Sequence, residues 1–178
     1  MQSPIRLTLA VVLLSVVTAC KKEQIQPDDT EPTTTSPRPA PTDTNVDRGP
    51  DPRDYTDPRN LDNPKSLLSQ RVIYFDFDKS DIRPEFRDIL SAHARYLGSR
   101  SSARVTLEGH ADERGSREYN LGLGERRGNS VSGALSAQRA SRSQLDVVSY
   151  GEERPVCRSS DDNCWQQNRR VEIVYTSK

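Results

Sequence analysis

The chain has 178 residues, a length that fits one domain or at most two. Lysine and arginine together number 26, as do aspartate and glutamate, so net charge gives no reason to expect a nucleic-acid partner. Only 32% of the residues are apolar, which is low for a chain that is globular throughout. The shortage of apolar residues is uneven along the sequence, and this unevenness divides the chain into three segments.

Residues 1–19 have the layout of an export signal. Arg6 and the amino terminus give a positive start, and an apolar run follows at residues 7–17. This run is too short to cross about 30 Å of hydrocarbon, so the pattern predicts a cleaved signal peptide rather than a membrane span.

The signal ends in Val17-Thr18-Ala19-Cys20, which resembles a bacterial lipobox. The resemblance implies that Cys20 is acylated, with palmitate among its chains, and becomes the first mature residue. Several acyl chains hold a protein on a membrane far more firmly than one. Lys21 stands where an aspartate often marks retention in the inner membrane, so the periplasmic face of the outer membrane is the expected location. The alternative is a plain signal peptide, in which Cys20 is incidental.

Residues 20–64 are predicted to be a lipidated N-terminus followed by a disordered linker. Nine of the twelve prolines lie between Lys21 and Pro64, and apolar residues are almost absent there. Such a stretch cannot bury enough surface to offset the entropy lost on ordering it. A spacer from a membrane to something a few nanometres away fits this composition better than a proline-rich docking ligand, because a clean PxxP repeat is missing.

The third segment, residues 65–178, is predicted to be a folded domain. Alternating apolar residues indicate strands, and apolar residues at helical spacing indicate helices. In chain order these are a strand at 72–77, a helix from about 84 to 98, a strand at 104–109, a helix at 118–138, and strands at 145–150 and 170–175. The order β-α-β-α-β-β predicts a two-layer α/β sandwich. The last two strands lie too close together for a helical crossover, so a mixed sheet is expected.

The remaining cysteines, Cys157 and Cys164, are expected to form a disulfide, because an exported protein meets an oxidising compartment. A zinc site is a poor alternative, because a second cysteine pair is missing and the two histidines lie far away in sequence. The sequence therefore predicts neither a metal nor another cofactor.

Two charged residues indicate a binding site. Asp112 follows the strand at 104–109, and strand ends of α/β sheets are where loops present polar groups to ligands. Arg127 shares a helical stripe with Leu123, so its stem faces the sheet. A guanidinium there needs an anionic partner, since an unpaired buried charge is costly. Spacing alone leaves two readings open, a structural Arg127–Asp112 ion pair supported by Asp78, or a ligand site.

Several motifs closely resemble those of the OmpA-like peptidoglycan-binding domain family. They lie at residues 74–78, 108–115, 119–120, 123–127 and 168–171. The resemblance covers about residues 71–178. With the lipobox and the linker, the whole chain resembles the peptidoglycan-associated lipoproteins of the Tol–Pal system.

Glycines in the second helix depart from a good helix-forming sequence. Gly128 stands where this family usually has alanine, and Gly122 and Gly124 lie six and four residues before it. Each is expected to weaken the helix by up to about 1 kcal/mol relative to alanine.

The resemblance implies a non-enzymatic protein that binds peptidoglycan. In the family, the residues matching Asp112 and Arg127 bind the diaminopimelate of an uncrosslinked stem peptide. A planar guanidinium takes a carboxylate by two parallel hydrogen bonds, and a nearby aspartate accepts from the ammonium of the same zwitterion. The full binding set that the resemblance implies is Phe77, Asp78, Asp112, Arg114, Asn120, Leu123 and Arg127.

The same resemblance implies a cellular role. The lipid on Cys20 and the domain at residues 65–178 would together tie the outer membrane to the cell wall, with a part in envelope integrity and cell division. TolB and other Tol proteins are the implied protein partners.

Three other classes of protein compete with this interpretation. A peptidoglycan hydrolase is the main one, because Asp76, Asp78, Glu108 and Asp112 supply carboxylates and paired carboxylates cut glycosides. No nucleophile–base pair stands out, however. A module that binds only proteins is the second alternative. A nucleotide-binding loop at residues 122–128 is excluded, because these glycines lie inside a helix rather than between a strand and a helix.

Overall fold

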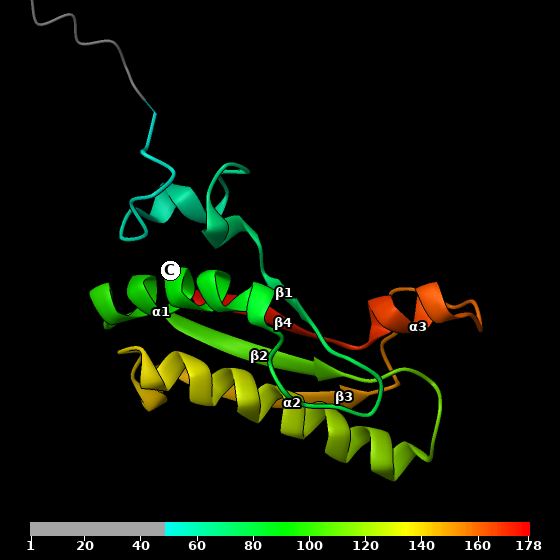
Figure 1. Ribbon diagram of the computed structural model, residues 1–178. Helices are drawn as coiled ribbons and strands as arrows, with labels where there is room; N and C mark the ends of the chain where they lie inside the picture. The colour runs from blue at the N-terminus through cyan, green and yellow to red at the C-terminus, as the bar shows by residue number, and fades with distance from the viewer. Residues whose placement is uncertain (1–48) are drawn as a thin grey trace, which may run out of the picture. The chain divides into compact units, whose positions relative to one another are not determined.

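The computed structural model describes residues 49–178, which belong to one compact unit (Figure 1). The expected signal peptide, the acylated Cys20 and the linker as far as residue 48 lie outside the described residues. The strands are β1 (Val72–Tyr74), β2 (Arg104–His110), β3 (Leu145–Gly151) and β4 (Arg170–Ser177). The α-helices are α1 (Arg87–Ser99), α2 (Arg117–Ala137) and α3 (Asp162–Asn168). Short 3-10 helices cover Pro58–Leu61, Leu67–Ser69, Pro84–Phe86 and Arg142–Gln144.

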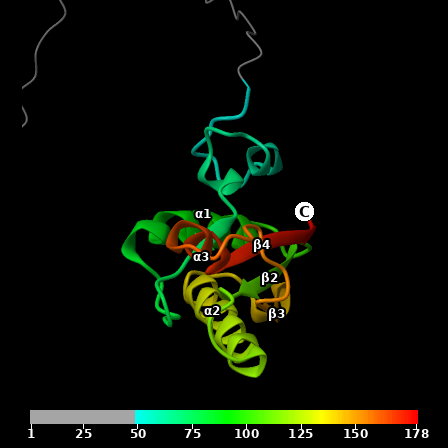
Figure 2. The ribbon, with the colours of Figure 1, turned by 90° about the vertical axis from the view of Figure 1, so that its right-hand side faces the viewer.

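The sheet is mixed, as the sequence predicts. Its strand order is β1-β4-β2-β3, with β2 parallel to β3 and β4 antiparallel to both β1 and β2. Helices α1 and α2 lie on the same side of the sheet (Figure 2). Between the two layers, Leu107 and Ile173 from the sheet pack with Leu97 and Val131 from the helices, all fully buried. The architecture is therefore the two-layer α/β sandwich that the sequence predicts.

Glycines allow α2 to lie directly on the sheet. A Cβ atom placed on Gly109 of β2 would lie 2.0 Å from the backbone oxygen of Gly124 in α2, and one on Gly124 would lie 2.8 Å from the backbone oxygen of Gly109. Real Cβ atoms do not approach other atoms this closely, so neither position accepts a larger residue without a shift of the backbone. Helix propensity alone predicts that Gly124 only weakens α2, whereas the structure shows that the helix needs this glycine to reach the sheet.

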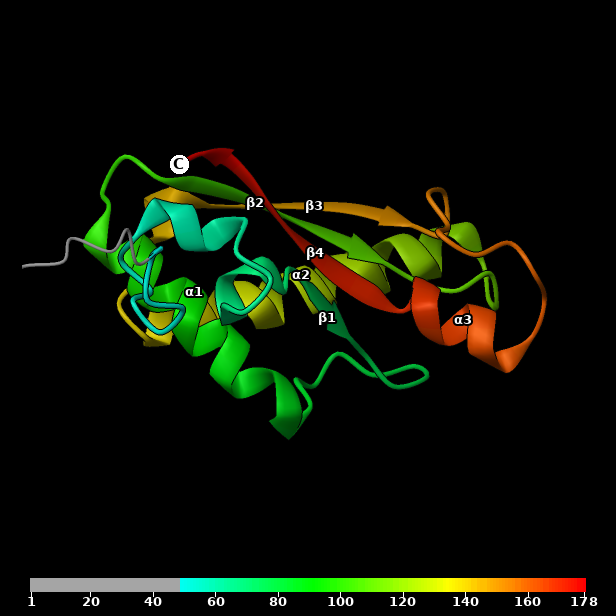
Figure 3. The same cartoon turned by 90° about the horizontal axis from the view of Figure 1, so that it is seen from above.

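The compact fold begins earlier than the predicted boundary at residue 65. The Pro58–Leu61 turn packs its Leu61 into the core, where the side chain is 1% exposed. Asn60 is fully buried and donates to the backbone oxygens of Asp51 and Asp54. In the view from above the segment overlaps α1 (Figure 3), and the guanidinium carbon of Arg95 in α1 lies 5.7 Å from the ring centroid of Tyr55. The predicted linker is therefore wrong for its last part, because a few isolated residues are enough to pin a proline-rich segment to the domain.

A short helix replaces the loop expected before the last strand. Asp161 caps α3 by accepting from the Cys164 backbone N–H at 2.9 Å. The predicted disulfide between Cys157 and Cys164 is present and joins α3 to the segment before it. A helix of seven residues gives too few apolar positions for its periodicity to show in the sequence.

Two smaller features complete the fold. Strand β1 ends at Tyr74 rather than at residue 77, and the chain then turns away through Asp78, whose φ is 55°. Within residues 49–178, no helix is both long enough and apolar enough to cross a membrane.

Candidate functional site

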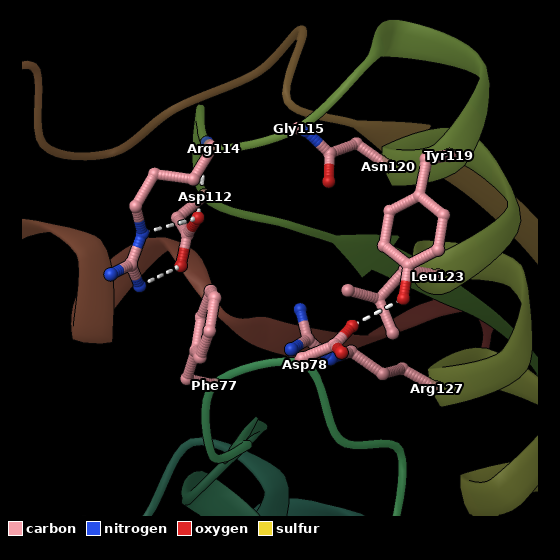
Figure 4. Close-up of a pocket in the computed structure, with 9 residues that line it drawn as sticks. All are labelled: Phe77, Asp78, Asp112, Arg114, Gly115, Tyr119, Asn120, Leu123 and Arg127. Carbon is pink, nitrogen blue, oxygen red and sulfur yellow. Dashed lines mark hydrogen bonds and ion pairs between the residues drawn. The ribbon is translucent and has the colours of Figure 1, made fainter.

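A pocket of about 220 Å³ lies where the β1–α1 loop, the end of β2 and the first half of α2 meet (Figure 4). All seven residues of the predicted binding set line it, and the structure adds Gly115 and Tyr119. The lining residues are Phe77, Asp78, Asp112, Arg114, Gly115, Tyr119, Asn120, Leu123 and Arg127. Residues up to fifty positions apart in sequence thus converge on one cavity.

Arg127 lies at the base of the site and is 0% exposed. Its Nε donates to the Lys79 backbone oxygen at 2.9 Å, Nη1 to that of His110 at 2.8 Å, and Nη2 to that of Asp76 at 3.1 Å. A guanidinium has five N–H donors, so one N–H remains on each terminal nitrogen. Burial, the largest effect, lowers the pKa of Arg127 to about 10, which still leaves the group cationic at neutral pH.

The ion pair between Arg127 and Asp112 that spacing left open is not formed. No ion pair within residues 49–178 includes Arg127, whereas Asp112 pairs with Arg114 at 2.8 Å and with Arg169 at 3.1 Å. Backbone carbonyls, which carry only partial charge, hold the Arg127 side chain in place instead. The cation therefore keeps its charge and two donors for another anion, and the attraction of nearby Asp112 helps to keep it protonated.

Asp112 is fixed as an ionised carboxylate. Oδ1 accepts from the backbone N–H and the Nε of Arg114, both at 3.1 Å, and Oδ2 accepts from Arg114 Nη2 and Arg169 Nη1. Burial alone would raise the pKa of Asp112, but these hydrogen bonds outweigh it and hold the pKa below its usual value. A carboxylate offers about four acceptor positions, and these four hydrogen bonds occupy them. A donor from a ligand can therefore bind Asp112 only by sharing one of these positions.

Asp78 supplies a second carboxylate across the cavity. Its left-handed backbone conformation, with φ at 55°, is uncommon for a residue other than glycine and turns the chain at the pocket. The Tyr119 hydroxyl donates to Asp78, which links the β1–α1 loop to α2 (Figure 4). Asp78 has fewer partners than Asp112, so its carboxylate is the more available of the two to a cationic ligand group.

Apolar and amide groups complete the lining. Phe77 is 56% exposed at the edge of the pocket, whereas Leu123 is buried and faces the cavity from α2. The Asn120 amide donates to Glu152 at 2.5 Å, which joins α2 to the segment after β3. Helix α2 begins just before these residues, because the Ser116 hydroxyl accepts from the Tyr119 backbone N–H at 3.2 Å.

Two residues near the pocket were missing from the predicted set. Arg169 bonds both Asp112 and the Phe75 backbone oxygen, and Trp165 lies against Arg114 with its ring centroid 4.1 Å from the guanidinium carbon. Arg169 belongs to a motif that carries the family resemblance, so that motif could have indicated it. Trp165 lies in the helix that the sequence pattern does not reveal.

The arrangement is suited to binding rather than to bond cleavage. A glycosidase needs a carboxylic acid whose pKa is raised enough to donate a proton, whereas the pKa of Asp112 is lowered. Glu108 alternates along β2 with the core residue Leu107, so it faces the other side of the sheet from α2. Among residues 49–178, no group of histidine, cysteine, aspartate and glutamate could hold a metal ion. A buried cation opposite two carboxylates instead matches a ligand that carries both signs of charge.

The fold and the pocket together define a ligand-binding α/β domain with a buried guanidinium in its site. The model of the OmpA family matches residues 74–169, and the chain belongs to this family. A Pseudomonas aeruginosa protein named peptidoglycan-associated lipoprotein is 48% identical over 114 residues, which cover 64% of this chain and 67% of that protein. A Haemophilus influenzae protein of the same name is 44% identical over 110 residues, covering 61% and 72%.

Solved structures agree with this assignment. A peptidoglycan-associated lipoprotein from Burkholderia pseudomallei has a TM-score of 0.64 at 40% identity and covers 65% of this chain and 98% of its own. The C-terminal domain of Helicobacter pylori MotB has a TM-score of 0.55 at 18% identity, covering 60% and 84%, which shows a shared fold alone. The relatives carry the name of a lipoprotein, in accord with the prediction that the chain is not an enzyme.

Proposed function

We propose that this protein binds peptidoglycan non-covalently, by holding the diaminopimelate end of an uncrosslinked stem peptide in the pocket around Arg127. One observation carries the proposal. Arg127 is fully buried, has three N–H groups bonded to backbone oxygens, and keeps two N–H groups for an outside anion. The names of the relatives at 48% and 44% identity support peptidoglycan as the polymer.

Each end of the diaminopimelate zwitterion has a partner of opposite charge. Its carboxylate takes the two free N–H groups of Arg127, a contact that a planar guanidinium makes with good geometry. Its ammonium lies between Asp112, as a shared contact, and Asp78, the carboxylate with more free acceptor positions. The methylene chain leading to these groups packs against Leu123 and the exposed ring of Phe77.

The proposal extends to the cell. Cys20 carries the lipid that holds the protein on the periplasmic face of the outer membrane, and the domain binds the cell wall. The protein then works within a Tol–Pal system, with TolB and other Tol proteins as partners, and supports envelope integrity and cell division. The family membership and the relatives' names support this role, and export is supported by the signal-like residues 1–19.

Calorimetric titration of residues 21–178 with three stem peptides tests the proposal. The peptides carry diaminopimelate, amidated diaminopimelate or lysine at the third position. Lysine keeps an ammonium but lacks the distal carboxylate, so Arg127 would stay without its anion in a desolvated pocket. Losing one partner of a buried, hydrogen-bonded charge pair costs about 2–5 kcal/mol, or roughly thirtyfold to several thousandfold in affinity. Equal affinity for the three peptides would reject the proposed ligand.

A further inference from the structure

We propose that Trp165 is a positioning residue for the peptidoglycan pocket, acting through Arg114; this inference rests on the proposed function of that pocket. The guanidinium carbon of Arg114 lies 4.1 Å from the ring centroid of Trp165 and 4.1 Å from that of Phe77. The guanidinium is therefore held between two aromatic rings that come from opposite ends of the domain sequence. A cation over the face of an aromatic ring is attracted by the negative charge of that face.

Helix α3 helps to fix the Asp112 carboxylate through two residues, Trp165 and Arg169. Trp165, in the middle of the helix, fixes Arg114, which donates to both carboxylate oxygens of Asp112. Arg169, at the C-terminal end of the same helix, donates to Oδ2 at 3.1 Å. Both arginines depend on where α3 lies, so the orientation of the pocket carboxylate depends on it too.

The helix itself is firmly attached to the domain. The Cys157–Cys164 disulfide joins it to the preceding segment. The Asn168 side chain accepts from the backbone N–H groups of Val156 and Cys157 and donates to the Cys157 oxygen at 2.7 Å. The Trp165 indole N–H donates to Glu113 at 3.0 Å, which fixes the orientation of the ring.

Trp165 does not line the pocket, but it fixes the position of Arg114, which does. If the ring is removed, one face of the Arg114 guanidinium loses its partner and the long side chain gains rotamers. The two Arg114 donors to Asp112 are then no longer held in fixed positions. The Arg114 side chain must instead become ordered when the ligand binds. Groups held in the binding geometry before the ligand arrives raise affinity, because less ordering is needed on binding.

Paired substitutions separate the aromatic contact from simple packing. Trp165→Phe keeps an aromatic face over Arg114, whereas Trp165→Leu keeps apolar bulk without a π face. In calorimetric titrations of residues 21–178 with the diaminopimelate peptide, we expect Trp165→Leu to bind about three- to tenfold more weakly than wild type, and Trp165→Phe to stay within about twofold. Tyr55→Leu is the matched control, because Tyr55 stacks with Arg95 on α1 and does not line the pocket. It should bind like wild type.

The fluorescence of the wild-type protein supplies a second readout. Trp165 is the only tryptophan in the sequence, so its emission reports this site alone. Ligand bound beside Arg114 should change the emission, with a midpoint that matches the calorimetric one, and Arg127→Lys should weaken both responses together. An unchanged emission at saturating peptide would overturn the role of Trp165 even if Trp165→Leu does not fold.

The outcomes distinguish this inference from the proposed function. Wild-type protein that does not bind the peptide would overturn the proposed function, and the positioning role with it. Wild-type protein that binds, while a folded Trp165→Leu variant binds as tightly or more tightly, would overturn the positioning role alone. Thermal melting followed by circular dichroism confirms that each variant is folded.

Discussion

Arg127 should be a structural cross-link as well as a ligand-binding residue, and Arg127→Met tests this. The substitution removes a fully buried guanidinium and leaves the backbone oxygens of Lys79, His110 and Asp76 without their donor. An orphaned buried acceptor costs about 1–3 kcal/mol. The His110 oxygen lies in a buried bond and the other two oxygens lie in partly buried ones, so the loss of all three, partly offset by the removal of a desolvated charge, should lower the free energy of unfolding by about 3–5 kcal/mol.

This loss is a large share of the about 5–15 kcal/mol by which domains are usually stable. In urea unfolding followed by circular dichroism, a slope of about 2 kcal/mol per molar turns it into a midpoint shift of about 2 M. The matched control is Arg126→Met. Arg126 is the neighbouring arginine, lies exposed on α2 and should cost less than about 0.5 kcal/mol. If the free energies of unfolding of Arg127→Met and Arg126→Met differ by less than about 1 kcal/mol, the carbonyl contacts do not stabilise the domain as described.

Three further changes have defined outcomes. Cys20→Ser should abolish acylation and leave soluble or unprocessed protein, and correct cleavage with retention in the outer-membrane fraction would contradict this. The pKa of His93 is lowered from 6.5 to about 4, chiefly by burial, so the unfolded chain takes up the proton first as pH falls. The titration of His93 alone should therefore lower the free energy of unfolding in urea by about 3 kcal/mol between pH 6.5 and 4, and an equal pH slope in His93→Gln would refute this. Reduction of the Cys157–Cys164 disulfide should cost about 2–3 kcal/mol, and unchanged thermal melting with reductant would exclude that contribution.

The fold is largely readable from the sequence because its long elements have strong periodicity. Strand β2 and helix α2 were predicted to within one residue at each end, at 104–109 and 118–138. The failures have local causes. A helix of seven residues shows no period, and the packing of residues 50–64 depends on single residues such as Leu61, whose burial no local pattern reveals.

The residues of the candidate site could be predicted from the sequence, but their hydrogen-bond partners could not. The family motifs contain all seven predicted lining residues, and the structure brings them to one pocket. The partners could not be derived from spacing. Arg127 pairs with backbone carbonyls rather than with Asp112, and Asp112 pairs with Arg169, which lies fifty-seven positions away. Helical spacing shows which face a side chain occupies, whereas its hydrogen bonds depend on segments that the fold alone brings near.

A double-mutant cycle between Arg127 and the distal carboxylate of diaminopimelate tests the central claim most directly. Wild-type protein and Arg127→Lys are each titrated with the diaminopimelate and lysine peptides, so that the cycle isolates the contact between the two groups. We expect wild type to prefer diaminopimelate by about thirtyfold or more, and Arg127→Lys to lose at least about tenfold of that preference, because an ammonium cannot make the planar two-bond contact. The same preference in both proteins would show that Arg127 does not bind the distal carboxylate.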